Sequence, residues 1–196
     1  DTNDAIVDDI QTEIPDYAKY GLKSGIVKLE SNTLGIKQNM TMYFDDWGNL
    51  TTNDIEMNLL GSKTHIRVII SKESIWQIDM INKTATKTDI KLGKDVNTIN
   101  DINYLTIEEN IEMLEQHGII VKYLQDVNII GKPCKKYSIQ ADNQSQITMA
   151  IWKGIPLSTI TQAMGINVTI EAKKIIENAD IPSDVFELPI DVEVKE

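Results

Sequence analysis

Cysteine and histidine, which often act as nucleophiles, bases or metal ligands, are rare in this sequence. The single cysteine, Cys134, could be a reactive thiol, but a cysteine that begins an apolar strand is more often a small buried residue. The two histidines, His65 and His117, lie far apart, and neither has a second ligand at the spacing of a metal site. We therefore interpret all three as structural, and we predict no metal site and no cofactor.

Paired carboxylates could act as a general acid and a general base, and such pairs occur at residues 8–9, 45–46 and 108–109. Adjacent acids point to different sides of a strand or helix, so they cannot share one reacting atom. No nucleophile elbow, phosphate loop or zinc motif is present. We predict that the protein is not an enzyme; a hydrolase with a polar cleft is the minor alternative.

The methionines form the pattern that most favours a function. They recur at apolar positions of predicted strands, and Trp76 lies among them. Flexible, polarisable side chains suit a cavity for variable acyl chains, but methionine fills an irregular core more often than it lines a site. Together with the apolar side of one predicted helix, the candidate ligand-binding residues are Met40, Met42, Met57, Trp76, Met80, Ile107, Ile111 and Leu114.

The elements that must position these side chains are mostly strands. From residue 22 onward, apolar and polar residues alternate, and turn signals recur about every ten residues. The alternation predicts that residues 66–70 and 76–80 present their apolar side chains to one face. We expect about nine to eleven strands in a mainly β (α+β) fold, with a large curved antiparallel sheet or incomplete β-barrel around one or two helices.

One helix is clear in "LTIEENIEMLEQHG", where Thr106 and Glu109 make a capping box and Gly118 ends the pattern. Its apolar stripe suits packing on the sheet. We expect one domain over residues 22–196, preceded by an acidic N-terminal extension over residues 1–21 that forms a short helix or a loose tether.

The segment "IWKGIPLSTI" at residues 151–160 interrupts the alternation. Trp152 lies opposite the main apolar set, which predicts a place near a rim or under a neighbouring segment. Gly154 permits a bend, and Pro156 cannot donate to a central ladder. We expect a strand that kinks and changes direction at a sheet edge.

Three segments, "GKPCKKYSI", "IWKGIPLSTI" and "EAKKIIENADIPSDVFELP", resemble in this order envelope proteins with the fold of the bacterial outer-membrane lipoprotein carriers. The resemblance covers about the last third of the chain and is greatest to uncharacterised members of that superfamily. It implies an incomplete barrel around helices with an apolar cavity for acyl chains. In the carriers an arginine near the cavity governs ligand release; the matching segments do not include Arg67, the only arginine here.

The resemblance also implies export to the periplasm or outer membrane, with a signal segment absent from this chain and an N-terminal lipid anchor preceding Asp1. The formal net charge of −11 makes nucleic acid an unfavourable partner. No apolar run approaches the length of a membrane span.

Two hypotheses for function follow. The first is a non-enzymatic envelope protein that binds a lipid or acylated ligand, including a lipoprotein, in an apolar cavity between sheet and helix. The alternative is an envelope scaffold or regulatory domain with a filled core that binds a protein partner.

Overall fold

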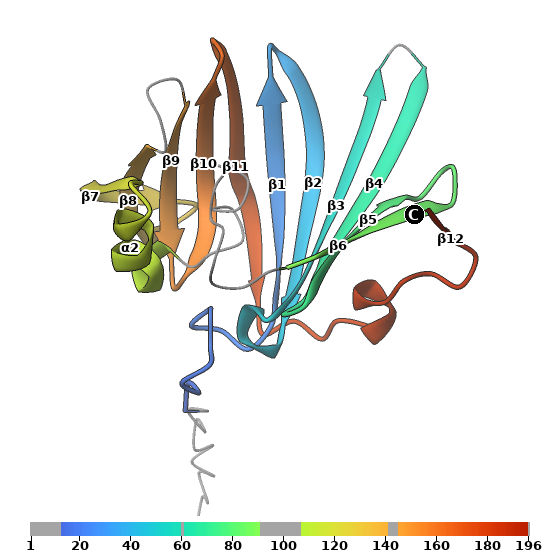
Figure 1. Ribbon diagram of the computed structural model, residues 1–196, viewed down its shortest axis with the longest axis horizontal. Coiled ribbons are helices and arrows are strands. Elements are labelled where there is room, and N and C mark those ends of the chain that lie inside the picture. Colours follow the sequence, from blue (N-terminus) through green and yellow to red (C-terminus); the bar gives the residue numbers. More distant parts are fainter. Residues whose placement is uncertain (1–12, 60, 91–106, 141–144, 196) are drawn as a thin grey trace, which may run out of the picture.

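The computed structural model describes residues 13–59, 61–90, 107–140 and 145–195, and all strands of this part belong to one sheet (Figure 1). The strands are β1 (Gly25–Thr33), β2 (Ile36–Asp45), β3 (Leu50–Leu59), β4 (Ser62–Ile70), β5 (Ser74–Asp79), β6 (Thr84–Asp89), β7 (Ile120–Ile129), β8 (Lys132–Gln140), β9 (Ser145–Trp152), β10 (Ile155–Ala163), β11 (Ile166–Glu177) and β12 (Glu193–Lys195). The helical elements of the described ranges are α2 (Ile107–Gln116) and two short 3-10 turns, η1 (Asp46–Gly48) and η2 (Ser183–Phe186).

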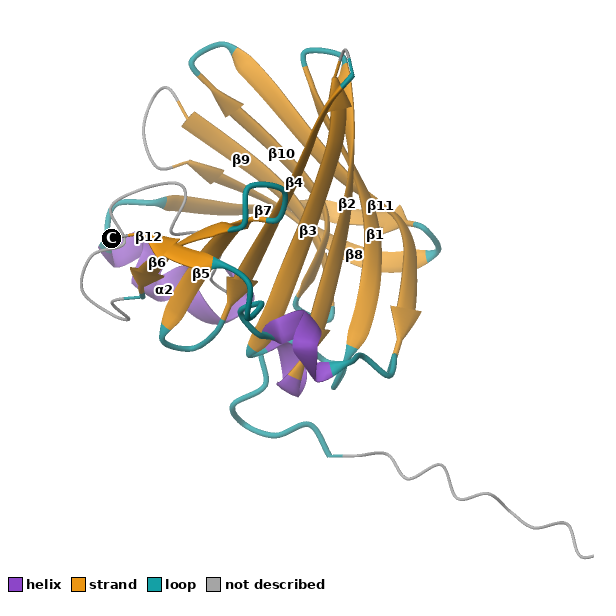
Figure 2. Ribbon diagram, turned by 90° about the vertical axis from the view of Figure 1, so that its right-hand side faces the viewer, coloured by secondary structure: helices purple, strands orange, loops and turns teal. Residues whose placement is uncertain are grey.

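The strand order is β12-β6-β5-β4-β3-β2-β1-β11-β10-β9-β8-β7. Two meanders, β1–β6 and β7–β11, meet where β1 pairs antiparallel with β11. The predicted mainly β fold with a large curved antiparallel sheet is confirmed, and the sheet stays open (Figure 2). The described part has twelve strands, which is one more than expected, because β12 is a three-residue parallel partner of β6 and too short for periodicity to reveal.

The two faces of the sheet differ in what covers them. We call the face on which α2 packs the inner face (Figure 2). There, Ile107 and Leu114 of α2 pack in one cluster with Ile139 of β8. The opposite, outer face of β4 to β6 is covered by the segment between β11 and β12, which we call the C-terminal segment. Its Leu188 packs with Ile78.

Helix α2 matches the prediction from its apolar stripe. It ends before His117, whose ring Nδ1 lies 2.8 Å from the carbonyl oxygen of Met113. A histidine is favourable there because the last carbonyls carry the negative end of the helix dipole. Thr106 of the predicted capping box lies outside the described residues.

The last part of the predicted N-terminal extension, residues 13–21, is neither helix nor strand and is docked on the sheet. The backbone amides of Lys19 and Tyr20 both donate to the carbonyl oxygen of Trp47 at 2.9 Å. The amide of Gly21 donates to the carbonyl oxygen of Lys153 at 2.9 Å. These bonds join the β2–β3 connection to the β9–β10 turn. Residues 1–12 lie outside the described part.

The prediction of a kink at a sheet edge near residue 154 is wrong. Lys153 and Gly154, both at positive φ, form the turn of the β9–β10 hairpin, and β10 lies inside the sheet between β9 and β11. Pro156 is tolerated there because the pairing of β10 with β11 begins only at Ser158, so no bond to β11 is lost. A register shift between Pro156 and Ser158 accommodates the ring against β9.

Trp152 packs under neighbouring segments, as the sequence indicated. Its side chain is buried, and two ammonium groups lie over its ring. The Nζ atoms of Lys132 and Lys153 are 4.6 and 5.0 Å from the ring centroid, within the range of cation–π attraction.

Candidate functional site

The strand register brings three of the predicted methionines to the inner face. One row of neighbours runs Leu29, Met40, Ile55, Ile66 across β1 to β4. Because side chains alternate along a strand, Met42 and Met57 point to the same face as Met40. These side chains therefore share one surface, as the sequence predicted for them.

The inner face of β1 to β4 carries no charged side chain among the described residues. By register and alternation, its apolar and neutral polar members are Gly25, Val27, Leu29, Ser31, Thr33, Ile36, Gln38, Met40, Met42, Phe44, Thr51, Asn53, Ile55, Met57, Ser62, Thr64, Ile66, Val68 and Ile70. The outer face of the same strands carries Lys28, Glu30, Lys37, Asp45, Asp54, Glu56, Lys63, His65 and Arg67. The charge is thus sorted completely between the two faces.

Burial divides this inner face into two regions. Val27, Leu29, Met42 and Phe44 are buried in a core cluster that also includes Trp152. Across the sheet toward β3 and β4, the inner side chains are only half-buried; they are Met40, Ile55, Met57, Ile66, Val68 and Ile70. This second group, which we call the apolar strip, offers hydrocarbon surface that the described part of the chain does not cover completely.

One buried polar atom of the inner face makes no hydrogen bond within the part of the chain that the structure describes. The Oδ1 atom of Asn53 is buried without a hydrogen bond among the described residues, between Met42 of β2 and Val68 of β4. A buried unsatisfied amide costs about 1–3 kcal/mol, which a bound polar group would recover.

The helix residues of the predicted site lie elsewhere on the inner face. Ile107 and Leu114 are fully buried against β8 and β9, and Ile111 packs at the edge of the same cluster. Ile139 and Ile147 belong to the same cluster. These helix side chains fill the space beside β8 and β9, so they and the apolar strip are separate regions.

Trp76 and Met80 belong to the outer face. Trp76 pairs with Ile69, and Ile78 pairs with Arg67, so Trp76 and Met80 lie on the face opposite Ile66 and its neighbours. The prediction that residues 66–70 and 76–80 present their apolar side chains together is wrong. The β4–β5 turn pairs Ile70 with Ile75, and a shift of one residue in a turn moves a whole strand's side chains to the other face. Leu188 and Val192 of the C-terminal segment pack against Trp76 and Met80.

The single arginine also lies on the outer face. Nε and an Nη atom of Arg67 donate to the two carboxylate oxygens of Asp54, each at 2.9 Å, and Nε2 of His65 is 3.3 Å from the same carboxylate. Burial by itself would raise the pKa of Asp54, but the hydrogen bonds and charges of Arg67 and His65 outweigh it and lower that pKa. This cluster was not recognised in the sequence, because the pairing of β3 with β4 creates it.

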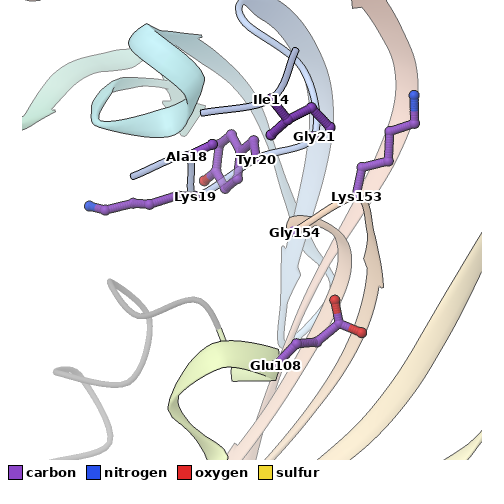
Figure 3. A pocket seen from close by; sticks show the side chains of 8 residues that line it. All are labelled: Ile14, Ala18, Lys19, Tyr20, Gly21, Glu108, Lys153 and Gly154. Atoms are coloured by element: carbon purple, nitrogen blue, oxygen red, sulfur yellow. The ribbon is translucent and has the colours of Figure 1, made fainter. Parts of the chain in front are cut away.

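A pocket of about 300 Å³ opens at the lower end of the molecule, between the docked N-terminal segment, the start of α2 and the β9–β10 turn (Figure 3). Lys19, Glu108 and Lys153 bring charge to its wall. The carboxylate of Glu108 already accepts a hydrogen bond from the hydroxyl of Tyr137 at 2.9 Å and lies 3.2 Å from Nζ of Lys135. None of the eight predicted residues lines this pocket.

Neither metal chemistry nor a membrane helix emerges from the described ranges. No group of three or more His, Cys, Asp or Glu side chains there could hold a metal ion. In the same part of the chain, α2 is too short and too polar to cross a bilayer, and no other helix does so. Cys134 is buried, as predicted, and burial raises the pKa of its thiol above the ordinary value.

Comparison with known proteins finds likeness in fold alone. No protein-family model and no curated protein sequence matches the chain. Among solved structures, an uncharacterised conserved protein from Thermus thermophilus aligns at TM-score 0.59 and 8% identity, over 88% of this chain and 90% of that one.

Two structures that contain MucB also match. The crystal structure of MucB aligns at TM-score 0.52 and 10% identity, over 90% of this chain and 61% of MucB. The complex of MucA and MucB from Pseudomonas aeruginosa aligns at TM-score 0.51 and 9% identity, over 88% of this chain and 58% of the matched chain. This chain therefore spans about three fifths of MucB, and the likeness agrees with the architecture that the sequence resemblance implied.

Proposed function

We propose that this is a non-enzymatic protein of the bacterial cell envelope that binds a lipid or the acyl chains of a lipoprotein along the apolar strip. The observation that carries the proposal is the sorting of charge between the two faces of β1 to β4. In a chain with a net charge of −11, an inner face without a charge is suited to hydrocarbon and unsuited to an ionic substrate.

The position of the ligand differs from the one expected from the sequence. The residues of α2 fill their own part of the sheet, so the ligand lies along Met40, Met57 and Val68 rather than between sheet and helix. The amide of Asn53 is available to a hydroxyl or carboxyl of the ligand at the buried end of the strip. Each methylene that leaves water contributes ~0.8 kcal/mol, so about eight would offset much of the cost of association.

Two variants of β3 test the proposal. Met57→Lys places a charge on the inner face, whereas Asn58→Lys places the same charge on the exposed outer face of the next residue. Titration of the purified protein with a fluorescent long-chain fatty acid should show binding by the wild type and by Asn58→Lys. Met57→Lys should weaken binding by at least about tenfold, which is 1.4 kcal/mol. Equal affinity of the two lysine variants, both with an unchanged melting temperature, would place the ligand elsewhere.

A second candidate function is binding of a protein partner, which two observations favour. MucB, which is similar in fold, has been solved in complex with MucA. In addition, β7 is a ten-residue edge strand with exposed apolar side chains, including Tyr123 at 55% and Leu124 at 49% exposure. Exposed edges of this kind accept an added strand.

A photo-crosslinking residue at Leu124 would test this second candidate in the envelope of intact cells, with the same residue at Met57 as the control. Partner binding at β7 predicts one defined protein adduct from position 124 and none from position 57. Adducts of lipid from position 57 and none from position 124 would favour the first proposal.

A further inference from the structure

Two hairpin turns at the upper end of the molecule expose large apolar side chains. Leu34 of the β1–β2 turn is 76% exposed, and Met164 of the β10–β11 turn is 89% exposed. The first residues of the strands that follow, Ile36 and Ile166, are 38% and 44% exposed. The two hairpins are neighbours because β1 pairs with β11, and their turns lie side by side in the sheet (Figure 1). We call these four residues the apolar tips.

The backbone geometry of the two turns does not favour large apolar residues at these positions. Leu34 and Met164 adopt positive φ angles of 52° and 51°, and each is followed by a glycine at positive φ. Two-residue hairpin turns of this kind favour Asn, Asp or Gly at the first position, and a large apolar residue there is strained. Leu34 and Met164 are 76% and 89% exposed, so burial within the chain does not offset this backbone strain. Burial of the two side chains against another molecule would offset the strain.

The charges near the apolar tips narrow the choice of partner. Residues 158–169 contain no charged residue, and residues 31–39 contain only Lys37, whose Nζ lies 3.1 Å from the carboxylate of Glu30. The chain as a whole has 30 acidic residues. Protruding aliphatic tips with almost no charge around them could enter a hydrocarbon layer without desolvating an ion.

The apolar tips are also continuous with the inner face. By register, Ile36 and Ile166 are inner-face positions, and the inner residues between them and the apolar strip, such as Gln38 and Val168, are uncharged. A surface that contacted the tips would therefore adjoin the strip.

We propose that the apolar tips are a docking site for a lipid bilayer, with Leu34 and Met164 inserted at the boundary between head groups and acyl chains. The proposal of docking is argued from the apolar tips alone. The purpose of docking, which is to bring the apolar strip next to lipid, depends on the proposed function. Because the protein is strongly acidic, the attraction is apolar, and anionic lipid should not strengthen it.

The test is flotation of the purified protein with phosphatidylcholine vesicles, with and without phosphatidylglycerol. The double variant Leu34→Asn/Met164→Asn creates two Asn-Gly turns, which suit the local φ angles and should leave the melting temperature equal or higher. We expect the wild type to float with both vesicles and the double variant to lose at least about tenfold in partitioning.

Ile130→Asn is the matched control, because Ile130 has φ 47°, precedes a glycine and is 38% exposed at the opposite end of the sheet. It should bind vesicles like the wild type. A wild type that does not float would overturn the proposal. Equal loss in the control, or no loss in the double variant, would overturn it as well.

Fatty-acid titration without vesicles separates this proposal from the proposed function. The tip variant should bind fatty acid like the wild type, and Met57→Lys should still float. If the wild type floats with vesicles but does not bind fatty acid, the proposed function is wrong and the docking site stands. If the wild type binds fatty acid but does not float, the docking site is wrong and the proposed function stands.

Discussion

At the scale of single residues, Tyr20 holds the N-terminal segment onto the sheet. Its ring lies edge-on to Phe44 with centroids 5.1 Å apart, and burial raises the pKa of its hydroxyl to about 12. A Cβ atom at Gly154 would lie 2.3 Å from the carbonyl oxygen of Lys19, so only glycine permits this approach. The glycine of the motif at residues 151–160 is therefore explained by a contact more than 130 positions away in the chain.

Removing the ring of Tyr20 should be costly. Tyr20→Ala leaves a cavity beside Phe44 and should lower the free energy of unfolding by about 3–5 kcal/mol, whereas Tyr20→Phe keeps the ring and should cost far less. Urea unfolding followed by tryptophan fluorescence measures both values. An equal loss in the two variants would show that the hydroxyl, not the ring, is what matters.

The Asp54–Arg67 pair predicts a response to pH. Because the pKa of Asp54 in the folded protein is below its ordinary value of 3.8, the ionised form stabilises the fold above that value. This stability is lost as the pH falls through the lowered pKa. Asp54→Asn should therefore lower the free energy of unfolding by about 1–3 kcal/mol at neutral pH and much less at strongly acidic pH. Chemical unfolding at a series of pH values checks this; a cost that does not change with pH would contradict it.

At the scale of elements, periodicity predicted the strands and α2 because each has a buried side with a regular spacing. It missed β12, which has three exposed residues and depends on its partner β6. It also failed for Trp76 and Met80, because alternation gives the two sides of a strand but not which side faces inward. That choice depends on the β4–β5 turn, whose register the sequence alone did not determine.

The C-terminal segment should behave as a cover of the outer face. Leu188 packs on Ile69, Ile78 and Ala85, so Leu188→Ala should lower the free energy of unfolding by about 1–3 kcal/mol. Fatty-acid binding should be unchanged, since the apolar strip lies on the other face. Unfolding curves and the same fluorescence titration measure the two quantities, and a parallel loss of affinity would link the two faces.

At the scale of the whole molecule, the sequence predicted the open curved sheet but only part of the candidate site. Met40, Met42 and Met57 share the inner face, as expected, while the apolar residues of α2 are separated from them by packing of their own. Within each of the strands β1 to β4, the alternation of charged and uncharged residues is visible in the sequence. Its extent across four strands became visible only with the pairing.

The most direct test of the central claim is an NMR measurement of contacts between bound palmitate and the methionine methyl groups. The protein would carry isotope-labelled methionine methyls, which report on both faces of the sheet. Binding along the apolar strip predicts nuclear Overhauser effects from the palmitate methylenes to Met40 and Met57 on the inner face and none to Met80 on the outer face. Contacts to Met80, or bound palmitate without contacts to Met40 or Met57, would contradict this placement of the ligand.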